Sequence, residues 1–217
     1  TKPNGIILEP VGKNTAPAIA LAALKLMDNK NDPLLLVLSA DHLIQNNNAF
    51  HRAIVSAEKF AIKDKLVTFG IVPNKAETGY GYIETGKSWP ENCYDIKSFT
   101  EKPNKKEAQK YLESSKYLWN SGMFMFKASN YINELEKFEP DMLNLCMKSL
   151  ENQQKDSDFI RLNNKAFFQC PNKSIDYAVM EKTKNAVVVS LDASWSDIGS
   201  WAALFNAGNK DKDGNVT

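Results

Sequence analysis

The sequence predicts an α/β fold with a mixed, mostly parallel central sheet flanked by helices. As far as Val72, predicted strands and helices alternate in the order β-α-β-α-β, which is typical of a parallel sheet. Two unbroken aliphatic runs, Leu34–Leu38 and Ala186–Leu191, suit strands that are buried on both faces. An aspartate follows each run within a few residues, Asp41 after the first and Asp197 after the second.

The N-terminal third supplies that alternating pattern. Its predicted elements, in order, are the strand Ile6–Leu8, the helix Thr15–Met27, the turn Asn29–Pro33, the strand Leu34–Leu38, the helix Ala49–Ile62 and the strand Leu66–Val72. Thr15 can cap the first helix, and a proline at position 17 is tolerated in a first turn. Apolar residues on one face make the second helix amphipathic.

The rest of the chain predicts a less regular order. Its elements are the strands Gly79–Ile83, Tyr94–Thr100, Leu118–Phe126 and Ala186–Leu191, the helices Lys105–Glu113 and Ser174–Thr183, helical patterning over Tyr131–Leu150 that Pro140 interrupts, a last helix around Ala202–Leu204, and a polar turn at Asn209–Asn215. A loop is expected at Gly86–Asn92. No repeat and no linker rich in glycine, proline or serine divides the chain.

Composition excludes several classes of function. The 217 residues carry a formal net charge of +1 with both signs interspersed, unlike a nucleic-acid-binding surface. No apolar run is long enough to span a membrane. The three cysteines form no CxxC pair and suit reduced thiols, and two histidines exclude a histidine-rich metal cluster. A cytoplasmic protein with no nucleic-acid or membrane partner is expected; a homo-oligomer stays open.

Asp41 and Asp197 are candidates for a metal site. Ligands of parallel α/β sheets bind just beyond the carboxyl ends of the strands, where both aspartates are expected. Two carboxylates there can share one Mg²⁺, which commonly takes one or two carboxylates plus substrate phosphates. The alternative is that each aspartate only caps a helix, and the residues alone leave both interpretations open.

A polar segment with Glu9, Asn14 and Thr15 follows the first predicted strand. A carboxylate that accepts two N–H donors suits guanine, whose ring N–H and exocyclic amine lie side by side. The residues alone favour the simpler interpretation, a helix start capped by Thr15.

Two further polar clusters suit a sugar phosphate. Glycine at position 81 lets another group approach the backbone, and Tyr80 can stack on a sugar or base, although a plain turn explains the segment almost as well. Glu101 and Asn120 can bind hydroxyl groups, and Lys102 can neutralise a phosphate; an isolated Glu-Lys pair is more often only solvated. The tryptophans expected in the core or in a site wall are Trp119, Trp195 and Trp201.

Taken in order, these clusters closely resemble the bacterial mannose-1-phosphate guanylyltransferase family. The resemblance runs from about Ile6 to Val216, and its ordered combination is far more specific than any one motif. The segments that carry it are Glu9–Ile19, Ala40–His42, Phe69–Pro73, Glu77–Ile83, Glu101–Pro103, Trp119–Phe124, Ser174–Glu181 and Trp195–Trp201.

The resemblance implies a Rossmann-like nucleotidyltransferase fold and a reaction of GTP with α-mannose 1-phosphate that gives GDP-mannose and pyrophosphate. The sugar-phosphate oxygen attacks the α-phosphorus directly, in line. The residues that it implies are Glu9, Asn14 and Thr15 for the nucleotide, Tyr80, Gly81, Glu101 and Asn120 for mannose, Lys102 for the sugar phosphate, and Asp41 and Asp197 for Mg²⁺. Asp41, Lys102 and Asp197 are then the catalytic residues.

Family members also carry an upstream Gly-rich loop and a downstream β-helix region, often followed by a phosphomannose isomerase domain. None of these occurs between residues 1 and 217, so this chain is expected to be the nucleotidyltransferase domain of a larger protein, which a fused isomerase domain would make bifunctional. Two alternatives stay open, a non-catalytic module that binds sugar nucleotides and a nucleotidyltransferase for another sugar phosphate.

Overall fold

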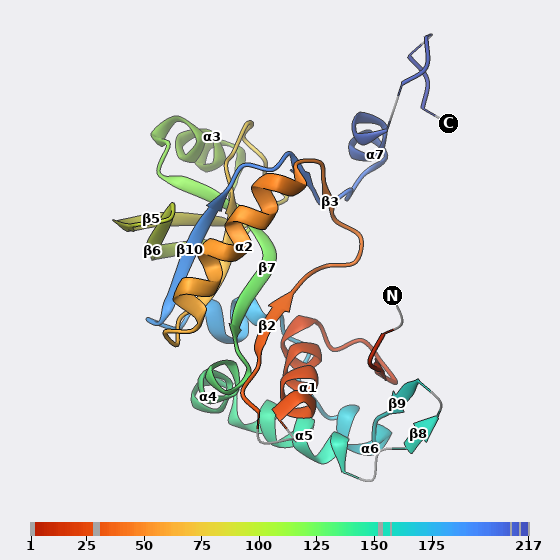
Figure 1. The fold of residues 1–217 in the computed structure, drawn as a ribbon. Coiled ribbons are helices and arrows are strands. Elements are labelled where there is room, and N and C mark those ends of the chain that lie inside the picture. The colour runs from red at the N-terminus through yellow and green to blue at the C-terminus, as the bar shows by residue number, and fades with distance from the viewer. Residues whose placement is uncertain are drawn as a thin grey trace. The chain divides into compact units, whose positions relative to one another are not determined.

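The computed structural model describes residues 3–27, 31–151, 154–156, 158–208, 210–212 and 214–216 (Figure 1). Two predicted turns, Asn29–Pro33 and Asn209–Asn215, therefore lie partly outside the described residues. The chain divides into two compact units. The first comprises residues 1–36, 61–66 and 125–186, and the second comprises residues 37–60, 67–124 and 187–217.

The first unit is mainly helical. Its elements are β1 (Ile6–Leu8), α1 (Thr15–Met27), α4 (Ala128–Phe138), α5 (Pro140–Leu150), β8 (Gln154–Asp156), β9 (Phe159–Arg161), α6 (Asn164–Phe167) and the π-helix η1 (Asp176–Met180). Helices α1, α4 and α5 pack against one another. The buried Tyr131 hydroxyl donates a 2.8 Å hydrogen bond to the Ala16 carbonyl and so joins α4 to α1.

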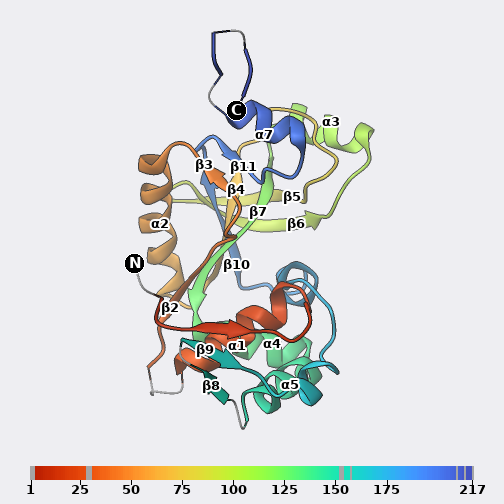
Figure 2. The same ribbon diagram turned by 90° about the vertical axis from the view of Figure 1, so that its right-hand side faces the viewer.

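A small sheet in this unit corrects one prediction. The strand Ile6–Leu8 was expected to belong to the main parallel sheet, but β1 pairs in parallel with β9, which pairs antiparallel with β8 (Figure 2). The sequence pattern does not predict β8 and β9, because β8 is the polar run Gln-Lys-Asp and β9 contains only two apolar residues.

The second unit is built on the main sheet. Its elements are β3 (Leu43–Ile44), α2 (Asn47–Ala61), β4 (Leu66–Ile71), β5 (Tyr82–Trp89), β6 (Cys93–Thr100), α3 (Lys105–Ser114), β10 (Ala186–Leu191), β11 (Trp195–Ser196) and α7 (Trp201–Ala207), and single residues of α2, β4 and β10 are assigned to the first unit. Strands β2 (Leu34–Val37) and β7 (Tyr117–Lys127) contribute residues to both units.

The main sheet is a mixed barrel, so the prediction of a mostly parallel sheet is wrong. Its strand order is β2-β7-β4-β10-β6-β5, and β5 also pairs with β7, which closes a ring of strands. Strand β6 is antiparallel to both β10 and β5, and β5 is antiparallel to β7. The α/β class itself is confirmed.

A hairpin explains the difference. The predicted loop at Gly86–Asn92 is mostly strand, because β5 continues to Trp89 before the chain turns. Glu91 and Asn92 make this turn with left-handed φ angles of 67° and 54°. A short turn forces the two strands to run antiparallel, and two register shifts within β5 bend it.

Several smaller predictions can now be compared with the structure. All three cysteines are free and buried, and the Sγ atoms of Cys146 and Cys170 lie 4.0 Å apart. Trp119 is buried and Trp195 is half-buried. Trp201 is 86% exposed and is therefore not a core residue, but it does line a cavity, beside Ile198 and Gly199. Among the described residues, no helix has the length and apolar character that crossing a bilayer requires.

Candidate active site

The carboxylate of Asp197 is held in a defined orientation within the second unit. It follows β11 directly, and its Oδ1 atom accepts a 2.8 Å hydrogen bond from the Tyr80 hydroxyl and a 3.1 Å bond from the Gly199 backbone N–H. Burial, followed by the hydrogen bond and negative charge of Asp197, raises the pKa of Tyr80 well above its ordinary value. The hydroxyl therefore stays a donor at neutral pH.

Asp41 lies at the same end of a short ladder. Strands β3 and β11 pair antiparallel, with Leu43 opposite Ser196. The segment before Leu43 and the segment after Ser196 therefore lie at the same end of this strand pair. The first segment contains Asp41 and the second contains Asp197. Asp41 is exposed in the turn that precedes β3. The two-residue strands β3 and β11 were not predicted, yet they bring these distant parts of the chain side by side.

The carboxylates of Asp41 and Asp197 are donors of the kind that Mg²⁺ prefers. Both hydrogen bonds to Asp197 fall on Oδ1, so Oδ2 is the atom left for a cation. A Cβ atom at position 199 would lie only 2.9 Å from Oδ2, and glycine there keeps this oxygen uncrowded. No group of three or more His, Cys, Asp or Glu side chains that could hold a metal ion occurs in the described part of the chain. Carboxylate oxygens from Asp41 and Asp197 fit Mg²⁺ if phosphates and water complete its coordination.

Gly81, Glu101 and Asn120 converge on one place in the barrel. An ideal Cβ on Gly81 would lie 2.5 Å from Oε2 of Glu101 and 3.4 Å from Cβ of Asn120. The Asn120 backbone N–H donates a 2.8 Å hydrogen bond to the Gly81 carbonyl. The absent side chain at position 81 therefore makes room for a carboxylate and an amide next to the same backbone.

Lys102 places a charge beside this group. Its ammonium lies 3.8 Å from Oε1 of Glu101, and its side chain is 67% exposed. The residue has a φ angle of 47°, in the left-handed region that few side chains favour. Lys102 can therefore accompany Glu101 and still present a positive charge to solvent.

Four aromatic rings form an unpredicted cluster in this unit. Tyr80 makes edge-on contacts with Trp119 and Trp195, with ring centroids 5.2 and 5.4 Å apart. Trp195 in turn contacts His42 edge-on at 5.2 Å and donates a 3.2 Å hydrogen bond from Nε1 to Nδ1 of His42. One sequence signal could have indicated this cluster: each of the four rings lies within two residues of a predicted site residue.

The three predicted nucleotide residues lie in the first unit. The Oε1 atom of Glu9 is buried without a hydrogen-bond partner among the described residues, and burial raises the Glu9 pKa despite an opposing bond from the Lys13 backbone. Asn14 has a left-handed φ of 71°, and its side chain accepts from the Thr15 N–H. Thr15 accepts from the Ile175 N–H at 2.9 Å, so its hydroxyl ties α1 to the segment that precedes the π-helix.

Glu9 also borders a cavity of about 660 Å³ in the first unit. The other lining residues come from the end of β1 and from the segment after β9, and they are Leu8, Pro10, Arg161, Leu162, Asn163, Asn164 and Lys165. An unsatisfied carboxylate oxygen next to such a cavity is able to accept an N–H donor of a bound base.

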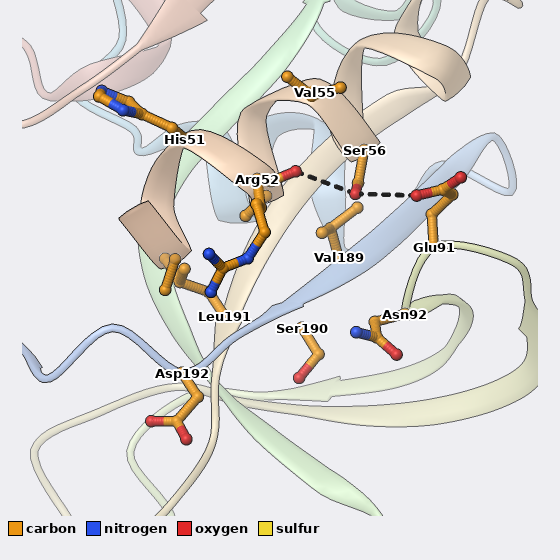
Figure 3. A pocket seen from close by; sticks show the side chains of 12 residues that line it. His51, Arg52, Val55, Ser56, Glu91, Asn92, Val189, Ser190, Leu191 and Asp192 are labelled. Carbon is orange, nitrogen blue, oxygen red and sulfur yellow. Dashed lines mark hydrogen bonds between the residues drawn. The ribbon is translucent and has the colours of Figure 1, made fainter. Parts of the chain in front are cut away.

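Another cavity, of about 540 Å³, contains none of the predicted site residues (Figure 3). It lies between α2, the end of β10 and the β5–β6 turn, and Arg52 points from α2 toward Leu191. Glu91 is paired with Lys59 at 2.6 Å, and Asp192 adds a second carboxylate to the wall. This mixture of charges selects no class of ligand.

Comparison with known proteins supplies the family. The "Nucleotidyl transferase" family matches residues 3–214. The mannose-1-phosphate guanylyltransferase of Klebsiella pneumoniae is 55% identical over 98% of this chain and 46% of its own length. The xanthan biosynthesis protein XanB of Xanthomonas campestris is 52% identical over 99% of this chain and 46% of its own length.

A solved structure agrees with the fold. The mannose-6-phosphate isomerase of Helicobacter pylori is 38% identical, with a TM-score of 0.78, over 88% of this chain and 73% of that chain. This chain spans about half the length of the curated relatives described above. The barrel, the ordered motifs and the extent of these matches together establish that the chain belongs to the nucleotidyl transferase family.

Proposed function

We propose that the protein transfers GMP from GTP to α-mannose 1-phosphate and releases pyrophosphate. The observation that carries this proposal is the convergence of Gly81, Glu101 and Asn120 at one place in the barrel. The names of relatives that are more than 50% identical over nearly the whole chain favour GTP and mannose 1-phosphate as the substrates.

The sugar phosphate is bound in the second unit. Glu101 accepts hydrogen bonds from vicinal hydroxyl groups, and Asn120 contributes a further polar contact. Gly81 permits the close approach of the sugar, while Lys102 neutralises the phosphate that will attack. A phosphate oxygen of mannose 1-phosphate forms the new bond to the α-phosphorus of GTP, and the bond from that phosphorus to pyrophosphate breaks.

Asp41 and Asp197 are the residues that would hold Mg²⁺. When bound, the ion neutralises triphosphate charge and aligns the reacting groups. The protein contributes at least one oriented carboxylate, since Asp197 is fixed by Tyr80 and Gly199 before any ligand arrives. Catalysis then depends on positioning and charge neutralisation, with no covalent intermediate on the enzyme.

In the first unit, we propose that Glu9 and Asn14 recognise guanine. The buried, unpartnered Oε1 of Glu9 supports this role, because a guanine N–H would satisfy it. Thr15 acts by holding the start of α1 beside Asn14.

We also propose a cytoplasmic location, which suits three free cysteines, and an isomerase activity in the whole protein, as the name of the Helicobacter pylori structure suggests.

The test is a pyrophosphate-release assay on the full-length protein with GTP, mannose 1-phosphate and Mg²⁺. Asp41→Ala and Asp197→Ala are each expected to lower kcat by about 10²–10³-fold, because each removes a transition-state charge partner. Asp192→Ala is the matched control, since this exposed aspartate lies five residues before Asp197 but has no proposed role. The proposal fails if wild-type protein releases no pyrophosphate from GTP while UTP, dTTP or ATP supports release.

A further inference from the structure

The aromatic cluster of the second unit lies among several of the candidate site residues. It consists of His42, Trp195, Tyr80 and Trp119, in contact in that order, with interplanar angles of 88°, 65° and 74°. Edge-on aromatic pairs of this kind each add roughly 0.5–1.5 kcal/mol beyond the burial of their area. Rings that are held at fixed angles by two neighbours keep the backbone on either side of them in place.

Each ring is also close in sequence to a proposed ligand-binding residue. His42 follows Asp41, Tyr80 precedes Gly81, Trp119 precedes Asn120, and Trp195 stands two residues before Asp197. The cluster therefore links the two carboxylates to the sugar-binding group. Tyr80 occupies the centre of the cluster, because it contacts two rings and also bonds to Asp197.

We propose that Tyr80 is a positioning residue for the metal-binding carboxylate of Asp197, and that it does not act by stacking on mannose. This inference rests on the proposed function. The hydroxyl of Tyr80 donates a 2.8 Å hydrogen bond to Oδ1 of Asp197, which leaves Oδ2 as the oxygen that would hold the cation. Trp119 and Trp195 hold the tyrosine ring, so its hydroxyl keeps a fixed place.

The geometry argues against stacking as the main role. The two tryptophans already contact the ring, and its only polar atom is engaged by Asp197. Tyr80→Phe separates the two roles, because the ring remains while the hydrogen bond is lost. If stacking matters, this variant behaves like wild type; if positioning matters, it loses metal affinity.

The experiment measures the binding of Mn²⁺ to full-length protein by the loss of the free-ion EPR signal, with and without GDP-mannose. Tyr80→Phe is expected to raise the Kd for Mn²⁺ by about 10–100-fold, the usual effect of removing a partner of a metal ligand. The KM for mannose 1-phosphate is expected to change less than about twofold, because the Glu101 group is intact. Thermal melts establish that each variant is folded.

Tyr117→Phe is the matched control. Tyr117 also lies in the second unit beside a carboxylate, that of Glu84, which has no proposed role. The Kd of the Tyr117→Phe variant for Mn²⁺ is expected to equal that of the wild-type protein. Tyr80→Leu removes the ring as well and should weaken Mn²⁺ binding at least as much as Tyr80→Phe.

An unchanged Kd for Mn²⁺ in Tyr80→Phe overturns the inference, and so does wild-type protein that binds no Mn²⁺ in either condition. A rise in the KM for mannose 1-phosphate without a change in Mn²⁺ binding would restore the stacking role. Failure of the proposed function is seen separately, as wild-type protein that binds Mn²⁺ but makes no GDP-mannose.

Discussion

Gly81→Ala is expected to damage sugar-phosphate binding without unfolding the protein. The new Cβ would lie 2.5 Å from Oε2 of Glu101 and 3.3 Å from Cε1 of Phe99. The first atom is the end of a flexible side chain, which can move away, and the second needs only a small adjustment. The substitution therefore displaces the carboxylate while the barrel backbone remains.

The displacement can be worked out from these contacts. A carbon and an oxygen atom normally approach no closer than about 3.3 Å, so the carboxylate must retreat by about 0.8 Å. A misplacement of about 1 Å at a reacting group can cost about 10²-fold in rate. Loss of a hydrogen bond to a charged group costs about 1.5–3 kcal/mol, or roughly 10–150-fold. We expect kcat/KM for mannose 1-phosphate to fall by about 10–100-fold.

The assay follows pyrophosphate release while mannose 1-phosphate is varied at saturating GTP, and then the reverse. The KM for GTP is expected to stay near the wild-type value, because the nucleotide residues lie in the other unit. Gly79→Ala is the control, since its Cβ would meet Oε1 of Glu77 at an ordinary 3.5 Å. Folded Gly81→Ala protein with a wild-type kcat/KM for mannose 1-phosphate would refute the proposed role of Glu101.

Two further predictions concern stability. Gly70→Ala would place a Cβ 2.6 Å from the Val188 side chain in the buried barrel. This overpacking should lower the free energy of unfolding, measured by urea titration, by about 1–3 kcal/mol. An unchanged free energy of unfolding would contradict this prediction. Burial raises the pKa of Glu139, but hydrogen bonds from Lys173 and Lys182 (2.7 and 2.6 Å) outweigh it and hold the pKa below its ordinary value. The stability lost in Glu139→Gln should therefore be largest above pH 4.5 and should shrink as the pH falls through the folded-state pKa; a loss that grows in acid would refute it.

Much of the secondary structure follows from local pattern. The aliphatic run Ala186–Leu191 is β10 with the predicted bounds, and the predicted helix Thr15–Met27 is α1. Helix α3 begins after Asn104, where a capping box with Glu107 satisfies both backbone donors. These elements are recognisable because their signals lie within a few neighbouring residues.

The sheet connections could not be predicted in the same way. Whether β5 pairs with β6 alone or also closes onto β7 depends on register shifts that bend β5, and alternation of apolar residues does not encode them. The two-residue strands β3 and β11 are too short for any periodicity. The partner of β1 likewise lies more than 150 residues away in sequence.

The amino-acid sequence alone determined the class of the fold, most of its helices and strands, and the residues that resemble a nucleotidyltransferase site. Only the tertiary structure decided which of them meet. The bond between Tyr80 and Asp197 joins residues 117 positions apart, and the space at Gly81 is filled by the carboxylate of Glu101, which directly follows β6. Local pattern records which side chains are present, whereas their contacts depend on the register and closure of strands that are remote in the chain.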